Sequence, residues 1–238
     1  MDTREIAPGL WRWTAPHPDW TPENDRPGGW GERVGAVYFE APPPAEAVVL
    51  IDPLAPPDGT ADADRFWALL DRDVSRAALP LTILLSNRHH GRSARVVYRR
   101  FAGRVGAAVY VPRGAEGRVA CEPTHLFDPG EPLPGAVESY GIDGLDEPEV
   151  AFFLRPHRAL VLADAVIGAG GGEVRVAPAS WSAGDDGGAR YRERFRASLA
   201  RLVGLDANVL LPSHGEPVLA LGAQALAAAL RAPAWGEG

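Results

Sequence analysis

The chain has 238 residues, a formal net charge of −7 at pH 7 and a single cysteine. The negative charge argues against nonspecific binding to nucleic acid or to an anionic membrane, and one cysteine excludes an internal disulfide or a multi-cysteine zinc site. Because no apolar run approaches the ~20 residues of a membrane span and no secretory signal is visible, we expect a cytoplasmic protein.

Two strands come first in the predicted order of elements. Residues 34–40 and 48–51 are apolar runs separated by a proline-rich turn, which is typical of neighbouring strands. A helix follows, for which Thr60 is the expected N-cap. Its apolar face is predicted from helical spacing to contain Ala63, Trp67, Leu70 and Val74.

The remaining elements continue the alternation of strands and helices. In chain order we expect a strand at 81–85, a helix from residue 94, a strand at 106–111, a short helix at 115–120, strands at 136–142, 149–154 and 159–162, a Gly-rich loop at 168–172, a helix at 190–203, a strand at 208–211 and a helix at 223–230. No repeat or linker interrupts this order, so one domain over residues 1–238 is expected. The pattern favours two sheets packed face to face with helices outside.

Three polar clusters occupy the same kind of position, directly after an apolar strand. The first contains Asn87, His89 and His90, the second Asp164 and the third His214. Strand ends converge in folds of this type, and imidazole and carboxylate are ligands that zinc, iron and manganese accept. The clusters therefore predict a metal site where these strands end.

The order of the clusters resembles the metallo-β-lactamase superfamily. The resemblance rests on the segments VVLIDP at 48–53, LLSNRHHGRS at 84–93, LVLAD at 160–164 and LLPSHG at 210–215, within a similarity that extends from residue 6 to residue 220. It implies a four-layer αββα sandwich. Members of the superfamily are mostly hydrolases in which one or two metal ions activate a water molecule.

The superfamily's H-x-H-x-D-H signature is incomplete in this chain. It falls on Asn87, His89, Gly91 and Arg92, so only the second histidine is present. The motif aspartate, which helps to orient the attacking water in the family, is replaced by Gly91. Ordinary two-metal hydrolysis is therefore not what this sequence predicts.

The other positions of the resemblance supply the expected ligands. Asp164 fits the family's bridging aspartate and His214 its last histidine, so a metal site of His89, Asp164 and His214 is implied. Further candidate site residues are Asn87 as a weak ligand, His90 as a substitute ligand, and Asp146 at the place of a histidine in a T-P-G-H-like segment.

Arg92 adds a fixed positive charge close to where a second metal ion would lie. A guanidinium stays protonated at working pH, so it cannot be a metal ligand. We hypothesise that Arg92 replaces the second metal ion and pairs with Asp164.

Two functions remain open at this point. In the first, one zinc, iron or manganese ion serves a hydrolase that acts on a small ester or thioester. In the second, the chain is a non-catalytic member of the fold that binds a small molecule or partner without any metal ion. His17 lies among Trp11, Trp13 and Trp20, and this aromatic segment is expected either in the core or facing the ligand groove.

Overall fold

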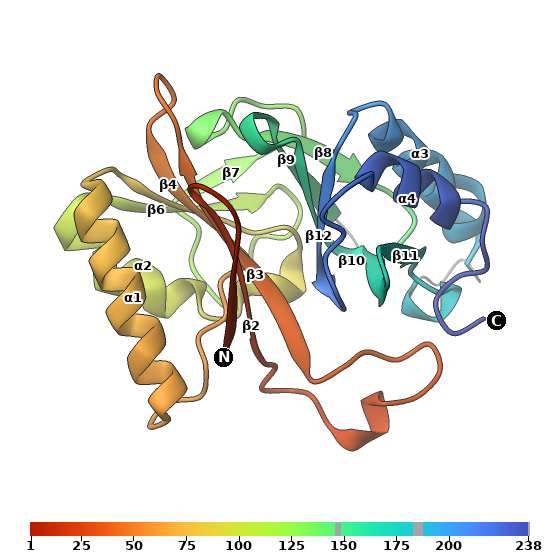
Figure 1. The fold of residues 1–238 in the computed structure, drawn as a ribbon, viewed down its shortest axis with the longest axis horizontal. Helices are drawn as coiled ribbons and strands as arrows, with labels where there is room; N and C mark the ends of the chain where they lie inside the picture. Colours follow the sequence, from red (N-terminus) through yellow and green to blue (C-terminus); the bar gives the residue numbers. More distant parts are fainter. Residues whose placement is uncertain (146–148, 183–187, 238) are drawn as a thin grey trace.

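A computed structural model describes residues 1–145, 149–182 and 188–237 of the chain. Its strands form one 12-stranded sheet that curls so that its two halves pack against each other, with helices on the outside (Figure 1). The helices are α1 (Ala61–Ala77) and α2 (Ala94–Val105) beside one half, and α3 (Arg196–Val203) and α4 (Gly222–Ala229) beside the other. Among these residues, no helix combines the length and apolarity needed to cross a bilayer.

The two halves of the sheet consist of consecutive stretches of the chain. The strands of the first half are β1 (Asp2–Ala7), β2 (Leu10–Pro16), β3 (Arg33–Ala41), β4 (Ala47–Ile51), β5 (Leu81–Leu84), β6 (Ala107–Pro112) and β7 (His125–Phe127). Those of the second half are β8 (Glu138–Ile142), β9 (Glu149–Leu154), β10 (Ala159–Gly170), β11 (Glu173–Val176) and β12 (Val209–His214). The halves are joined where β3 meets β12, through the pair Val34 and His214.

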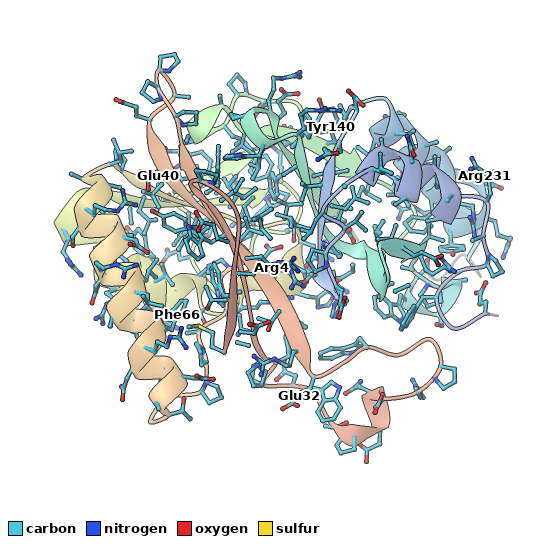
Figure 2. The ribbon with its side chains drawn as sticks, in the orientation of Figure 1. Arg4, Glu32, Glu40, Phe66, Tyr140 and Arg231 are labelled. Carbon is cyan, nitrogen blue, oxygen red and sulfur yellow. The ribbon has the colours of Figure 1, made fainter. Side chains whose placement is uncertain are left out.

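Three hydrophobic clusters separate the four layers. Alternate residues of β4 face opposite sides: Leu50 packs toward the helices of the first half, whereas Val49 packs toward the second half of the sheet. On the helix side, Phe66 of α1 contacts Trp13 with ring centroids 5.5 Å apart, and its position on that helix is labelled in Figure 2. Phe153 and the α3 residue Leu199 belong to the third cluster. This arrangement confirms the predicted αββα sandwich.

Most predicted elements are present, with differences that have local causes. Thr60 is the N-cap of α1, and its Oγ1 accepts a hydrogen bond from the backbone N–H of Ala63 at 3.1 Å. Phe66, rather than Trp67, lies on the fully buried face of α1. The predicted short helix at 115–120 is wrong, because this segment is a series of turns.

The parallel pairs of the sheet bring several strand ends to one place. β4, β5 and β6 are parallel neighbours in the first half, and β10 runs parallel to β12 in the second. In β10 the register against β12 changes between Leu162 and Ile167, whose partners Pro212 and His214 are only two residues apart. Such a bulge bends a strand and redirects its side chains, and Asp164 lies within it.

Candidate metal centre

A cavity of about 380 Å³ lies at these strand ends. Polar and aromatic side chains from both halves of the sheet line it, among them His17, Trp30, Asn87, His89, His90, Arg92, Glu149, Asp164, Trp181 and His214. All the predicted site residues that the structure describes therefore reach one cavity. Asp146, the remaining candidate, lies outside the described residues.

Three of these side chains form a group whose ligand atoms all lie within 4.8 Å of one another: His90, Asp164 and His214. The Oδ1 atom of Asp164 is at the centre, 3.2 Å from Nε2 of His90 and 3.1 Å from Nε2 of His214. Of the three expected ligands, the structure brings Asp164 and His214 together, and the third member of the group is His90.

His89 lies at the rim of the cavity and not in this group. It is exposed, and its Nε2 accepts a hydrogen bond from Nε of Arg88 at 3.1 Å. The two histidines differ because they occupy successive positions of a short 3₁₀ turn, Arg88–Gly91, in which neighbouring side chains point about 120° apart. His90 therefore points inward and His89 outward.

His90 is held from its other side by a buried carboxylate. Its Nδ1 lies 2.8 Å from Oδ2 of Asp52 and 2.9 Å from Oγ of Ser86. The Oδ1 of Asn87 accepts hydrogen bonds from the backbone N–H groups of His89 and His90, which fixes the turn. A carboxylate behind the histidine is the partner that metal-ligating histidines usually have.

Asn87 and Arg12 orient the other two members of the group. Nδ2 of Asn87 donates to Oδ2 of Asp164 at 2.8 Å, so Oδ1 remains for the two histidines. Nη2 of the buried Arg12 donates to the carbonyls of Pro212 and Gly215 at 3.1 and 2.8 Å, on both sides of His214. Asn87 thus acts as an orienting donor in the structure, whereas the sequence suggested a weak ligand.

The charges in the group are strongly coupled. Burial and Arg92 lower the pKa of His90, but the carboxylates of Asp164 and Asp52 outweigh them and raise it to about 9. Burial raises the pKa of Asp164, but His90 and His214 hold it well below its ordinary range. Burial lowers the pKa of His214. Asp164 is therefore an anion that attracts a proton or a metal ion to the neighbouring ring nitrogens.

Arg92 reaches the site but does not pair with Asp164, so that part of the hypothesis is wrong. Its Nη1 donates to the carbonyl of Gly35 at 3.1 Å, and its Nη2 donates to Oγ of Ser213 at 2.8 Å. Nη2 also lies 3.0 Å from Nε2 of His90. Both terminal guanidinium nitrogens are thus engaged, while Nε is buried without a hydrogen-bond partner, and among the described residues no ion pair joins Arg92 to Asp164.

The donor set suits one small cation. With bonds of about 2.0–2.1 Å, two ligands of a tetrahedral zinc ion lie about 3.3 Å apart, close to the separations around Asp164 Oδ1. A guanidinium can only donate hydrogen bonds. When Nε2 of His90 carries no proton, this nitrogen therefore accepts a hydrogen bond from Nη2 of Arg92. Its lone-pair side then faces the carboxylate of Asp164, and a cation between them removes the repulsion.

The missing motif aspartate has a steric explanation. A Cβ atom on Gly91 would lie 2.8 Å from the backbone nitrogen of Ala120, closer than real Cβ contacts come. The turn segment 115–120 thus occupies the space that an aspartate at this position would need.

Restoring the motif with Gly91→Asp should therefore destabilise the protein and not create a second metal site. We expect a loss of about 1–3 kcal/mol in the free energy of unfolding, measured by urea denaturation. Gly103→Asp is the matched control, because a side chain there meets open space, and it should change stability by less than about 0.5 kcal/mol. Unchanged stability in Gly91→Asp, or two bound ions, would contradict this explanation.

Aromatic rings form the wall beside His214. The ring centroids of Trp30 and Trp181 lie 5.4 and 5.6 Å from that of His214, and His17 packs edge-on against Trp30 at 5.0 Å. Nε1 of Trp181 donates to the carbonyl of Gly28 at 2.7 Å. The loop that carries His17 and Trp30 thus contributes to the cavity, and His17 faces this cavity.

Sequence reasoning gave no site role to Asp52 or Glu149. Asp52 follows the apolar strand β4 directly, so the rule that identified the other three clusters would have identified it too. Glu149 begins β9, in which every residue is buried. Burial, followed by the charge of Asp164, raises the pKa of Glu149 to about 8. In the sequence, Glu149 could have been recognised as a charged residue at the start of an otherwise apolar strand.

Comparison with known proteins identifies the fold. No protein-family model and no curated protein matches the chain. Among solved structures, it is similar to a β-lactamase domain protein from Burkholderia ambifaria, with a TM-score of 0.65 and 17% identity over 96% of this chain and 71% of the other. It is also similar to a metallo-β-lactamase from Pontibacter korlensis, with a TM-score of 0.60 and 15% identity over 98% and 99% of the two chains.

A third similar structure is a metallo-β-lactamase from Hirschia baltica, with a TM-score of 0.60 and 13% identity over 97% of this chain and 96% of the other. At such identities the likeness concerns the fold and not the individual site residues. Together with the four layers and the clustered strand ends, it shows that this chain has the metallo-β-lactamase fold.

Proposed function

We propose that the chain binds one divalent metal ion through His90, Asp164 and His214 and hydrolyses a small ester or thioester. The observation that carries this proposal is the group of three ligand atoms within 4.8 Å of one another in the cavity. Zinc, iron and manganese all accept imidazole and carboxylate together.

When bound, such an ion polarises a carbonyl group and makes a water molecule a better nucleophile. The residues around it support binding of a single ion. Asp52 orients the ring of His90, and the fixed charge of Arg92 at 3.0 Å from Nε2 opposes a second cation. Trp30 and Trp181 narrow the cavity beside His214, which suits a small acyl group.

Elemental analysis of protein purified without added metal tests the proposal. We expect about one zinc, iron or manganese ion per chain, retained in the control His125→Ala, whose histidine is exposed and lies away from the cavity. His214→Ala should lose the ion. Hydrolysis of p-nitrophenyl acetate and of an acetyl thioester should follow the metal content. A wild-type protein that stays free of metal after incubation with each of the three ions overturns the proposal.

One observation favours a second candidate function, the binding of a small molecule without metal. Nη2 of Arg92 lies 3.0 Å from the same His90 nitrogen that would hold the ion, so the guanidinium competes for it. In that function His90 is a buried cation that compensates Asp52 and Asp164. The same elemental analysis distinguishes the two, because only the first requires stoichiometric metal.

A further inference from the structure

Glu149 is a buried carboxyl group in the wall of the cavity with one oxygen unused. Glu149 is 2% exposed, and its Oε1 accepts a hydrogen bond from the backbone N–H of Ala165 at 2.9 Å. Oε2 has no hydrogen-bond partner among the described residues. The two other buried or partly buried carboxylates here, Asp52 and Asp164, both contact His90, whereas no ion pair within the described part of the chain includes Glu149.

The contact with Ala165 explains only half of this side chain. Ala165 lies in the bulge of β10, where its N–H has no strand partner, and an acceptor from β9 satisfies it. A glutamine would supply the same acceptor without the cost of burying an ionisable group. The structural role therefore accounts for Oε1 but gives no reason for a carboxyl group with a free Oε2.

The position of Glu149 is fixed relative to the ligand group. The backbone N–H of its neighbour Val150 donates to the carbonyl of Ser86 at 2.9 Å, which joins the start of β9 to the loop that carries His90. Ala165 directly follows Asp164. Glu149 is thus tied to both segments that supply ligands, yet it is not a member of the three-residue group itself.

The other titratable groups of the cavity are worse placed to move a proton. Nε2 of His89 faces Arg88 at the rim, and Nδ1 of His17 accepts from the backbone N–H of Asp19 at 3.2 Å. His90, Asp164 and His214 hold one another. Among the described residues lining the cavity, Glu149 combines burial with an oxygen that nothing else uses.

We propose that Glu149 is the catalytic residue that transfers the proton during hydrolysis, an inference that rests on the proposed function. Oε2 takes a proton from the attacking water as the water oxygen bonds to the carbonyl carbon of the ester or thioester. The same proton then passes to the leaving oxygen or sulfur as its bond to that carbon breaks. The products are a carboxylic acid and an alcohol or thiol, and no further reactant is needed.

Glu149→Gln is the central variant, because its amide oxygen can still accept from Ala165. Glu122→Gln, an exposed carboxyl outside the cavity, is the matched control. In zinc-loaded protein, kcat for p-nitrophenyl acetate should fall by about 10²–10⁴ in Glu149→Gln with little change in KM, while zinc content stays at the wild-type level. Glu149→Asp, which keeps a carboxyl group further from the substrate, should retain intermediate activity.

A binding measurement provides a second readout that needs no turnover. Methylphosphonate is a tetrahedral anion that resembles the addition intermediate. Because two negatively charged oxygens repel each other, the carboxyl group of Glu149 must carry a proton when this anion binds beside Oε2. Calorimetry at pH 9, above the pKa of about 8 of Glu149, in buffers of different ionisation enthalpy should show uptake of about one proton on binding to the wild type and less in Glu149→Gln.

The outcomes separate this proposal from the proposed function. Equal kcat and equal proton uptake in wild type and Glu149→Gln overturn the role of Glu149 while the metal-dependent hydrolysis stands. Zinc-loaded wild type that neither hydrolyses the ester nor binds methylphosphonate overturns both the role and the hydrolysis and leaves only a metal site. Wild-type protein that binds none of the three metal ions overturns the proposed function itself.

Discussion

Replacing His90 by alanine should abolish metal binding, whereas His89→Ala should bind metal like the wild type. His90 is buried, its Nε2 lies 3.2 Å from Oδ1 of Asp164, and Asp52 orients its ring. His89 is exposed at the rim of the cavity. Because outer-shell partners alone are worth about 10–100-fold in metal affinity, loss of a direct ligand should cost more than about 100-fold.

The two variants form a matched pair, since they remove the same side chain from adjacent positions. Zinc affinity measured by competition with a chromophoric chelator distinguishes them, and far-ultraviolet circular dichroism shows whether both are folded. Loss of zinc in His89→Ala with retention in His90→Ala would reverse the assignment and restore the ligand set that the sequence motif implies.

The pH dependence of metal binding follows from the same histidine. In the absence of metal, the pKa of His90 is raised to about 9, so at pH 7 a proton occupies the ring nitrogen that a metal ion would use. Lowering the pH favours the proton. The zinc affinity of the wild type should therefore fall as the pH is lowered from 9 to 6, by up to about tenfold per unit for this one group, and rise toward pH 9.

The fold could be predicted because the information for it is local. Apolar runs of strand length, each followed by a polar cluster, identify β5, β10 and β12, and a capped amphipathic helix identifies α1. These features depend on residues close together in the sequence. The layers then follow, because each apolar face must be covered by another element.

The members of the site depend on details that sequence spacing does not contain. Two adjacent histidines follow β5, and only the geometry of the 3₁₀ turn held by Asn87 selects His90. Asp164 points into the cavity because β10 bulges against β12. Trp30 and Trp181 meet beside His214 although 150 residues separate them in the chain.

The comparison with the H-x-H-x-D-H signature led to one wrong prediction, the pairing of Arg92 with Asp164. It associated the gained cation, Arg92, with the aspartate that remains, Asp164. In the structure the guanidinium binds the carbonyl of Gly35 and the hydroxyl of Ser213 and lies beside His90. Arg92 and Asp164 thus both lie beside Nε2 of His90 and do not pair with each other, which one-to-one matching of motif positions does not reveal.

Arg92→Met should destabilise the protein by about 3 kcal/mol and increase the stabilisation that zinc provides. The variant leaves the carbonyl of Gly35 and the hydroxyl of Ser213 without their donor, and it removes one of the two positive charges near Asp52 and Asp164. His90 remains as the other. The carboxylates are then less compensated, so an added cation should be held more tightly.

Urea denaturation with and without excess zinc measures both effects, and Arg95→Met, which alters an exposed arginine, is the control. If Arg92 keeps the site to a single ion, its removal should raise the zinc-dependent gain in stability above that of the wild type, in proportion to RT ln(1 + [Zn]/Kd). An equal gain in both proteins would show that the guanidinium does not oppose metal binding. Arg92 would then only stabilise the folded protein, through its hydrogen bonds to the carbonyl of Gly35 and the hydroxyl of Ser213.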